Sequence, residues 1–352
     1  MVRNRSVMST ARIAVFKGPG QPQEFQDLPL PECGVGELLV AIFCATICAS
    51  DLHTIDGRRR EPTPCVLGHE AVGRVIAVGA DRSPALVGQR VTWSLADSCG
   101  GCEPCREWDL PQKCDRLFKY GHAQLSDGSG LNGCYASHIL LRRGTAVVPV
   151  PDTVPDEVAA PANCALATMV NATERLPDPC RLAVIQGAGM LGIYGCALLR
   201  ARGVARVVVV DTNPARLGLV AAFGGEPALG SATGVIRPGQ ADAVFEVAGT
   251  SAVVEEGVLL LRPGGFYAWV GMVHPATPLA FTGEAVLRKC LTISGYHNYA
   301  PRHLAQGMAF LKRYSAAYPW ASLVSPAFPL TDLIAALELA RSQQWLRVAI
   351  RP

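Results

Sequence analysis

The sequence feature that most constrains the fold is a glycine-rich turn between a short apolar stretch and a helix-like one. The turn, Gly187-Ala188-Gly189-Met190-Leu191-Gly192, fits the pattern G-x-G-x-x-G. An apolar stretch at 182–186 precedes it, a Leu- and Ala-rich stretch at 190–201 begins within it, and a nearly all-valine stretch follows at 205–210. Strands that are apolar on both faces belong in a parallel sheet covered by helices. The region is therefore predicted to be doubly wound α/β, with further strands at 243–247 and 265–270.

The same turn predicts where a dinucleotide binds. After a strand and at the start of a helix, backbone N–H groups and the helix dipole can hold a pyrophosphate. Asp211 ends the next strand, where a carboxylate can accept hydrogen bonds from a ribose 2′-hydroxyl and repels a 2′-phosphate. NAD is therefore favoured over NADP, although Arg216 could pair with a phosphate. The alternative is a structural turn followed by an N-capping Asp.

The rest of the chain has a different pattern of apolar runs and turns. At 352 residues the chain exceeds the size at which one hydrophobic core stops growing, so two domains are expected. Up to about residue 151, short β-rich runs alternate with Gly and Pro turns, which predicts a barrel-like all-β domain with strands at 13–16, 37–44, 73–78 and 90–93. After about residue 296 we expect helices near 303–313 and 330–343 and a last strand at 346–350.

Charge and hydropathy exclude several classes of protein. The net charge of +3 is mild, and Lys and Arg are too scattered for a nucleic-acid surface. No stretch approaches the ~20 apolar residues that span a membrane, and the apolar stretch at 13–16 is too short for a secretory signal. We therefore expect a cytoplasmic protein that binds neither nucleic acid nor membrane. Its thirteen cysteines should be reduced, so closely spaced ones favour metal binding.

Four of these cysteines form a compact motif. Cys99, Cys102, Cys105 and Cys114 stand in a C-x2-C-x2-C-x8-C run. Four thiolates close a tetrahedral shell around zinc and leave no open position, so the run predicts a structural zinc site. Disulfides and a nucleic-acid-binding zinc ribbon are the alternatives, and the expected reducing compartment and the lack of a basic stripe argue against them.

A second metal site is only partly visible in the sequence. Cys48 begins the segment Cys48-Ala-Ser50-Asp51-Leu-His53, and His69 lies in Gly68-His69-Glu70. A thiolate and an imidazole are suitable zinc ligands, but two are too few. Spacing alone does not choose the third among the other cysteines, which are Cys33, Cys44, Cys65, Cys134, Cys164, Cys180, Cys196 and Cys290.

Taken together, these motifs resemble a known family. Cys48-x-Ser50-x-x-His53, Gly68-His69-Glu70, the four-cysteine run, Cys164-x3-Thr168 and the glycine turn follow one another as in the zinc-dependent alcohol dehydrogenases of the medium-chain dehydrogenase/reductase superfamily. The resemblance covers almost the whole chain. It implies a GroES-like β-barrel catalytic domain at 1–162, a Rossmann NAD-binding domain at 163–297 and a return to the catalytic domain at 298–352. It also implies an active site in the cleft between the domains, and a homodimer or homotetramer.

The resemblance assigns roles to single residues. It implies a catalytic zinc bound by Cys48, His69 and Cys164, with Glu70 as a candidate fourth ligand, and hence two zinc ions per chain. Thr168 would touch the nicotinamide ring, and Arg347 would meet the cofactor pyrophosphate.

The reaction so implied is hydride transfer between an alcohol, or its aldehyde or ketone, and NAD(H). Ser50 would accept the alcohol proton, and His53 would pass it towards solvent. The alternative is a non-catalytic NAD-binding or redox-sensing relative with the same fold.

The substrate is less constrained. The segments 110–114, 117–122 and 295–299 are similar to a bacterial subgroup associated with phosphonate metabolism. In that case Lys119, His122 or the arginine cluster Arg58-Arg59-Arg60 would bind an anionic head group. By contrast, Trp93, Leu95 and Phe118 would suit an apolar secondary alcohol. His297 and Tyr299 are further candidates to line the pocket.

Overall fold

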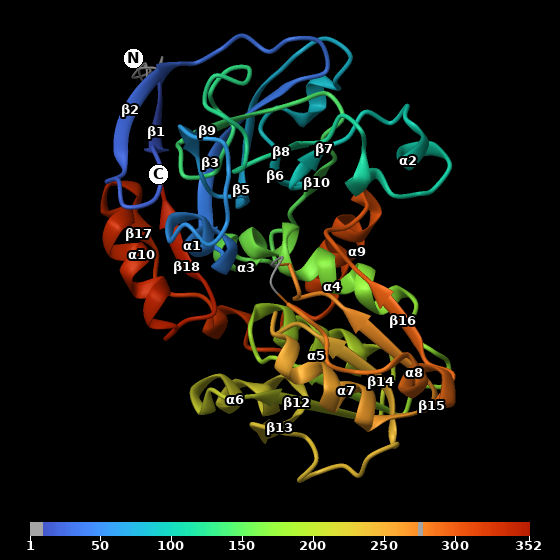
Figure 1. Cartoon of the computed structure of the whole chain (residues 1–352). Helices are drawn as coiled ribbons and strands as arrows, with labels where there is room; N and C mark the ends of the chain where they lie inside the picture. The colour runs from blue at the N-terminus through green and yellow to red at the C-terminus, as the bar shows by residue number, and fades with distance from the viewer. Residues whose placement is uncertain (1–9, 274–276) are drawn as a thin grey trace. The chain divides into compact units, whose positions relative to one another are not determined.

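The computed structural model describes residues 10–273 and 277–352, which divide into two compact units (Figure 1). The first unit runs to Cys164 and resumes at Ala321, and the second is Ala165–Trp320. The two predicted architectures, a β-rich domain and a doubly wound domain with a parallel sheet, are both present, so the predicted fold class is confirmed. Residues 1–9 and 274–276, which the predicted domains include, lie outside the described residues.

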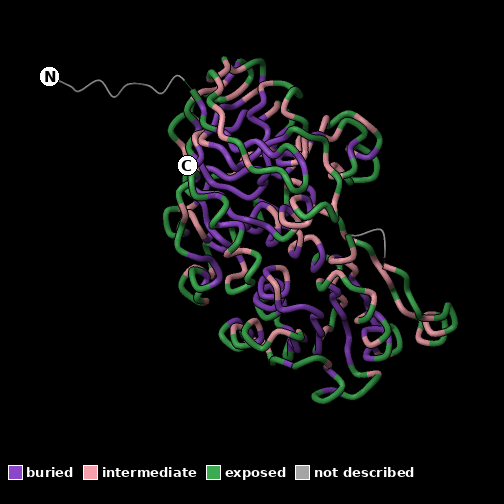
Figure 2. Tube along the Cα trace, turned by 60° about the vertical axis from the view of Figure 1, so that its left-hand side comes forward, coloured by how far each residue is buried: buried purple, intermediate pink, exposed green. Residues whose placement is uncertain are grey.

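The first unit is built mainly from antiparallel strands. Its largest described sheet has the order β10-β6-β5-β3-β18-β17, with β9 also pairing β3, beside a sheet β2-β1-β4 and a ribbon β7-β8. Buried apolar side chains from these strands form one core. Figure 2 shows the buried residues along the chain in purple. The strands are β1 (Thr10–Phe16), β2 (Glu24–Pro29), β3 (Leu38–Ile47), β4 (Cys65–Val66), β5 (Glu70–Val78), β6 (Arg90–Trp93), β7 (Ala96–Asp97), β8 (Phe118–Lys119), β9 (His138–Leu141), β10 (Val147–Pro149), β17 (Phe328–Pro329) and β18 (Val348–Arg351).

Short helices connect these strands. Most are a single turn long. The α-helices are α1 (Ala49–Ile55), α2 (Glu103–Arg106), α3 (Asp156–Ala159) and α10 (Leu333–Ser342), and the 3-10 helices are η1 (Pro84–Leu86), η2 (Pro111–Lys113), η3 (Ala160–Asn163) and η7 (Leu330–Asp332).

The second unit is a parallel sheet with helices packed on it. The strand order is β13-β12-β11-β14-β15-β16, so the order reverses between β11 and β14. In such sheets a dinucleotide binds at the carboxyl ends of the strands beside this reversal. The strands are β11 (Leu182–Gln186), β12 (Arg206–Asp211), β13 (Glu226–Leu229), β14 (Ala241–Glu246), β15 (Leu261–Trp269) and β16 (Thr292–Gly295).

Helices α5, α6 and α7 contact these strands (Figure 1). The glycine turn leads from β11 into α5, whose bounds match the predicted helix at 190–201. The helices of the unit are α4 (Ala165–Glu174), α5 (Met190–Ala201), α6 (Pro214–Val220), α7 (Val254–Leu260), α8 (Gly283–Arg288) and α9 (Pro301–Arg313), with η4 (Ala221–Phe223), η5 (Ser251–Val253) and η6 (Trp320–Leu323), the last at the join of the units.

Helix α9 belongs to the second unit, whereas the sequence analysis places the return to the first domain at residue 298. Its buried side includes Leu304 and Met308, and it packs on α4, where a Cβ on Gly307 would lie 3.2 Å from Leu166. Asn171 on α4 also donates to the carbonyl of Asn298 at 2.8 Å. These contacts keep the chain in the second unit up to Trp320. Within the described residues, no helix is both long and apolar enough to cross a membrane.

Candidate active site and metal sites

Three separate segments of the first unit bring together two thiols, an imidazole and a carboxylate. One ligand atom from each of Cys48, His69, Glu70 and Cys164 lies within 4.8 Å of all the others. Cys48 follows β3, His69 and Glu70 stand at the start of β5, which pairs with β3, and Cys164 follows η3. Two thiolates and an imidazole are donors that zinc prefers, so these side chains fit a zinc ion.

Two residues fix how the segments meet. Asn163 donates from Nδ2 to the carbonyl oxygen of His69 at 3.0 Å and to that of the last residue of β6 at 3.0 Å, which ties the turn before Cys164 to both strands. Gly68 has φ +87°, and a Cβ there would lie 2.6 Å from the Tyr135 ring. Glycine is therefore required where the chain turns to present His69.

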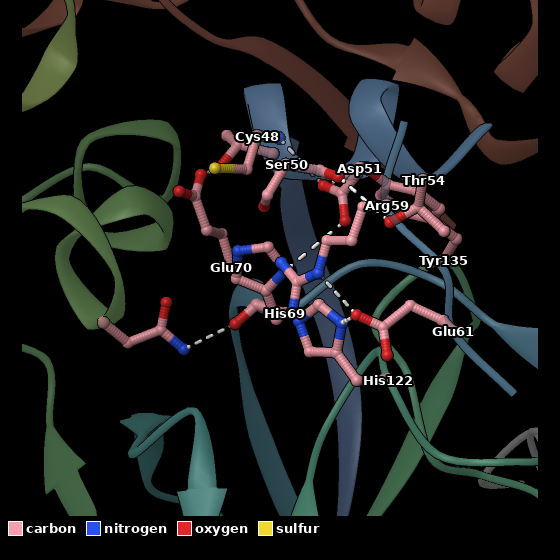
Figure 3. A network of polar contacts seen from close by, with 12 residues as sticks. Cys48, Ser50, Asp51, Thr54, Arg59, Glu61, His69, Glu70, His122 and Tyr135 are labelled. Carbon is pink, nitrogen blue, oxygen red and sulfur yellow. Dashed lines mark hydrogen bonds and ion pairs between the residues drawn. The ribbon is translucent and has the colours of Figure 1, made fainter. Parts of the chain in front are cut away.

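Asp51 connects the ligands to the helix that follows them (Figure 3). Its Oδ2 accepts hydrogen bonds from the Cys48 amide at 2.9 Å and the Tyr135 hydroxyl at 2.8 Å, and its Oδ1 lies 3.4 Å from His69 Nδ1. A carboxylate behind an imidazole orients the ring for metal binding. The sequence analysis did not assign a role to Asp51 or Tyr135. An acid three residues after a helix N-cap position was the available signal for Asp51.

Glu70 is held by a bidentate ion pair. Arg347 donates from Nε and Nη2 to the two carboxylate oxygens at 2.7 and 2.8 Å, and Thr46 donates to Oε2 at 2.6 Å. Burial raises the pKa of Glu70 to about 7, and the guanidinium opposes this shift. Arg347 Nη2 also lies 3.5 Å from Cys48 Sγ. Its side chain thus faces Glu70 and Cys48, and its contact with a cofactor pyrophosphate stays a prediction.

The two thiols differ in acidity. A hydrogen bond from the Cys164 thiol, with the nearby charge of Arg347, holds the pKa of Cys48 well below its usual range despite burial. The same hydrogen bond, together with burial, raises the pKa of Cys164. Cys48 is therefore the first of the pair to become a thiolate, which is the form that binds metal.

The predicted proton-transfer residues lie on one short helix. Ser50 and His53 are half-buried on α1, three residues apart and therefore on one face. Figure 3 shows Ser50 beside Cys48. Thr168, predicted to touch the nicotinamide, is half-buried on α4 of the second unit.

The four-cysteine run forms a second set of metal donors. Sulfur atoms of Cys99, Cys102, Cys105 and Cys114 all lie within 4.8 Å of one another. Cys102 Sγ is 3.4 Å from Cys105 Sγ, far longer than the ~2.05 Å of a disulfide, and all thirteen cysteines are free. The amides of Cys99 and Arg116 donate to Cys114 Sγ at 3.2 and 3.4 Å. Four such donors fit a closed zinc shell.

The glycine turn has the geometry of a phosphate cradle. A Cβ on Gly192 would lie 1.9 Å from the Gly187 carbonyl oxygen, so helix α5 can pack this close only with glycine. Gly189 differs, because a Cβ there would meet no atom within 4 Å. Met190 and Leu191 form the first turn of α5. The start of α5 therefore has open space beside Gly189, and pyrophosphate binding there stays a prediction.

Asp211 ends β12 next to this turn. Its Oδ2 accepts from the Ala188 amide at 2.7 Å, and its Oδ1 accepts from the Asn213 amide at 2.8 Å. Arg216 Nη1 lies 4.0 Å from the same carboxylate. The acid and the arginine are thus neighbours.

Comparison with known proteins decides the family. Two family models match, described as "Alcohol dehydrogenase GroES-like domain" over residues 34–152 and "Zinc-binding dehydrogenase" over residues 191–313. The L-threonine 3-dehydrogenase of Chelativorans sp. (strain BNC1) is 30% identical over 79% of this chain and 81% of its own length. The chain belongs to the zinc-dependent alcohol dehydrogenase family.

Two further relatives cover nearly the whole of this dehydrogenase. The 5-exo-hydroxycamphor dehydrogenase of Pseudomonas putida is 27% identical over 97% of this chain and 99% of its own. The crystal structure of an alcohol dehydrogenase from Thermotoga maritima matches with a TM-score of 0.89 at 30% identity and covers 97% of this chain and 99% of its own. The predicted family and enzyme class, a zinc- and nicotinamide-dependent oxidoreductase, are therefore confirmed.

Proposed function

We propose that this dehydrogenase transfers hydride between an alcohol, or its aldehyde or ketone, and NAD(H) at a zinc ion bound by Cys48, His69 and Cys164. The observation that carries the proposal is the convergence of these donors, with Glu70, within 4.8 Å. Three protein ligands leave a position for substrate, which is the pattern of a catalytic zinc. Zinc in such a site lowers the pKa of a bound water from 15.7 to about 7 and supplies the same polarisation to an alcohol.

The chain's own residues then handle the proton. The alcohol loses the proton of its hydroxyl group and a hydride from the carbon that bears this group, NAD+ accepts the hydride, and a carbonyl group forms. In the reverse direction NADH returns the hydride and the proton is returned to the oxygen. Ser50 accepts the proton, and His53 passes it towards solvent from the same face of α1. Glu70 is a candidate fourth ligand, but its ion pair with Arg347 favours a role beside the metal.

A second zinc is proposed for Cys99, Cys102, Cys105 and Cys114, giving two ions per chain. Four thiolates leave no open position, so this zinc has a structural role. The chemistry of the first site does not depend on it directly.

NAD is proposed as the cofactor. Gly187, Gly189 and Gly192, with the first turn of α5, would hold the pyrophosphate, and Thr168 would meet the nicotinamide ring. The Asp211 carboxylate would accept hydrogen bonds from the ribose and repel a 2′-phosphate. Arg216 would lie beside the adenosine ribose. Its ion pair with Asp211 leaves less of its positive charge to bind a 2′-phosphate.

Assembly and location are proposed from the same family pattern. A homodimer or homotetramer is expected, which gel filtration with light scattering tests. Thirteen free cysteines support a reducing compartment such as the cytoplasm.

Two substitutions, measured separately, test the activity. Cys164→Ala should stay folded, lose the catalytic zinc and lose turnover, whereas Ser50→Ala should keep both zinc ions and lose turnover. A screen of alcohols with NAD and with NADP, followed by the absorbance of the reduced nicotinamide, measures activity, and atomic emission measures zinc. Full activity of Cys164→Ala would overturn the ligand assignment.

A further inference from the structure

A cluster of charged side chains lies against the proposed catalytic ligands (Figure 3). The His122 ring stacks on the His69 ring, with centroids 5.3 Å apart and planes inclined by 28°. Glu61 Oε1 lies 3.0 Å from His122 Nδ1 and 2.6 Å from Arg59 Nε. The loop after α1 supplies Arg59 and Glu61, and the turn after β8 supplies His122. The cluster therefore surrounds one face of a zinc-ligand candidate.

Lys119 extends this cluster. Its neighbours Phe118 and Tyr120 are buried in the barrel, and strand alternation directs the Lys119 side chain to the opposite side. Partial burial and the charge of Arg59 lower the pKa of Lys119, against the opposing influence of Glu61 and of Cys164. The His122 amide donates to the Lys119 carbonyl oxygen at 3.3 Å, so Lys119 stands directly beside the cluster. Among the described residues, no hydrogen bond or ion pair joins its ammonium group.

The cluster carries an excess of positive charge. Arg59 and Lys119 are cations, Glu61 is the single carboxylate between them, and an imidazole such as His122 carries no negative charge. The thiolates of Cys48 and Cys164 would be balanced by the divalent ion. Within this cluster the cations outnumber the carboxylates by one. The next carboxylate, Asp51, is buried behind the His69 ring at 3.4 Å, whereas the Arg59 side chain is 31% exposed, so an incoming anion can reach it.

The apolar side chains that would suit a neutral substrate are buried in the first unit and expose almost no surface. Trp93, Leu95 and Phe118 are 0%, 5% and 6% exposed, and Trp93 and Phe118 belong to the barrel core. Phe118 is also covered by the Arg142 guanidinium at 3.7 Å from its ring centroid. The relatives do not decide the polarity of the substrate, since one is a dehydrogenase of hydroxycamphor, which is largely apolar, and another of L-threonine, which is charged.

We propose that the substrate is an alcohol, or the matching carbonyl compound, that bears a carboxylate, phosphate or phosphonate on a short carbon chain, and that Lys119 and Arg59 bind this anion. This inference depends on the proposed function, because it takes the reacting oxygen to lie at Cys48, His69 and Cys164. Lys119 offers a compact charge and Arg59 a planar set of donors, which together suit any of the three anions.

Matched acids and esters test the proposal. The zinc-loaded enzyme with NAD is assayed on 3-hydroxybutyrate, hydroxypropyl phosphate and hydroxypropyl phosphonate. Each is compared with a neutral ester, which is the methyl ester of the carboxylate and the dimethyl ester of the phosphate and of the phosphonate. We expect kcat/KM for the acids to exceed that for the esters at least about tenfold, and to fall with added salt. The three acids also report which anion the site prefers. Equal use of acids and esters would overturn the proposal.

Variants assign the effect to the cluster. Lys119→Met and Arg59→Gln should each lower kcat/KM for the acids roughly 10- to 100-fold, the range for a lost hydrogen bond between charged groups, and leave the esters unchanged. Glu61→Gln should act in the opposite direction and raise kcat/KM for the acids. Arg60→Gln, which removes an exposed charge from the same loop, is the matched control and should change neither. Equal losses for acids and esters in Lys119→Met would contradict the proposal.

Binding separates this inference from the proposed function. Calorimetric titration of zinc-loaded protein without NAD should detect 3-hydroxybutyrate but not its methyl ester, and Lys119→Met should lose that difference. If neutral alcohols are oxidised but the acids neither bind nor react, the anion site is wrong and the proposed function stands. If no alcohol or carbonyl compound reacts, the proposed function fails, and binding of the acid alone decides the anion site.

Discussion

At the scale of single residues, Asp51 joins parts of the site that are distant in sequence. One carboxylate contacts the Cys48 amide, the Tyr135 hydroxyl and the His69 ring. It is buried, and its Oδ1 faces Nδ1 of the His69 ring. A residue in this position sets both the orientation of the ring and its basicity.

Asp51→Asn should therefore weaken zinc binding. Loss of an outer-shell carboxylate typically costs 10–100-fold in metal affinity or activity, and we expect a loss of about that size in both. Zinc affinity is measured by competition with a chromogenic chelator, and turnover with the best alcohol found. Asp56→Asn removes an exposed carboxylate beyond the end of the same helix and should leave both unchanged. Wild-type zinc affinity in Asp51→Asn would rule out the orienting role.

The sequence limits what can be predicted at this scale. The Cys48 and His69 segments were visible as ligands, but spacing could not choose Cys164 from the eight cysteines that remain besides Cys48 and the four-cysteine run, and the resemblance supplied it. The carbonyl contacts of Asn163 and the hydroxyl of Tyr135 depend on strand pairing across the barrel. Such contacts are long-range, so no local pattern encodes them.

At the scale of elements, the β11–α5 turn separates packing from binding. Gly192 and Gly189 lie in the same turn. A Cβ on Gly192 would lie 1.9 Å from a backbone oxygen, whereas a Cβ on Gly189 would lie in open space. Gly192→Ala should destabilise the second unit by roughly 1–3 kcal/mol and weaken NADH binding as a consequence. Gly189→Ala should unfold like wild type but bind NADH more weakly, because the methyl group occupies the proposed pyrophosphate space.

Thermal unfolding and NADH fluorescence titration distinguish the two variants. Unchanged NADH affinity in Gly189→Ala would mean that the pyrophosphate lies elsewhere. Unchanged stability in Gly192→Ala would mean that the turn can relax, and that close packing of helix on strand is not what requires this glycine.

Asp242 links three strands of the parallel sheet and gives its stability a pH dependence. Its carboxylate accepts from the amides of Arg181 and Leu182 at 2.7 and 2.9 Å and pairs with Arg262 at 2.6 Å. Although burial acts to raise it, these hydrogen bonds lower the pKa of Asp242 below its usual value. A lowered folded-state pKa stabilises the fold above the unfolded-state pKa of about 3.9, and this stabilisation is lost as the pH falls through the folded-state value.

Asp242→Asn should therefore lower stability by roughly 1–3 kcal/mol at neutral pH, the size of a lost charged hydrogen bond, and by less in acid. Urea unfolding of the two proteins at a series of pH values measures the difference. A gap between them that stays constant from neutral pH down to pH values below 3 would show that ionisation of Asp242 does not stabilise the fold.

The bounds of helices and strands were predicted better than the elements against which they pack. The strands at 182–186 and 90–93 and the helix at 190–201 match β11, β6 and α5, because their apolar periodicity is local. The helix at 303–313 was also expected, and α9 is found at Pro301–Arg313. Its amphipathic pattern shows that one side is buried, but not that α4 covers it. The unit to which α9 belongs depends on that packing, and periodicity does not carry this information.

At the scale of the whole molecule, two sets of sulfur donors lie in one unit, and only one of them includes an imidazole and a carboxylate. The donor chemistry predicts two zinc ions with separable roles. A closed four-thiolate shell contributes folding free energy to its loop, whereas a three-ligand site contributes chiefly chemistry. Wild-type protein should therefore contain two zinc ions per chain. Cys164→Ala and Cys102→Ser should each retain one, but with opposite consequences.

Cys164→Ala should unfold close to the wild-type temperature and lose turnover. Cys102→Ser should unfold at a lower temperature and become sensitive to proteolysis between residues 99 and 114, because α2 and η2 in this loop have few other contacts to hold them. Its remaining zinc should still support turnover at temperatures where the loop variant stays folded. Atomic emission, calorimetry and limited proteolysis on the same preparations measure the three quantities. Loss of turnover in Cys102→Ser with both fold and catalytic zinc intact would show that the four-cysteine loop acts on the reaction itself, and the separation of roles between the two sites would be wrong.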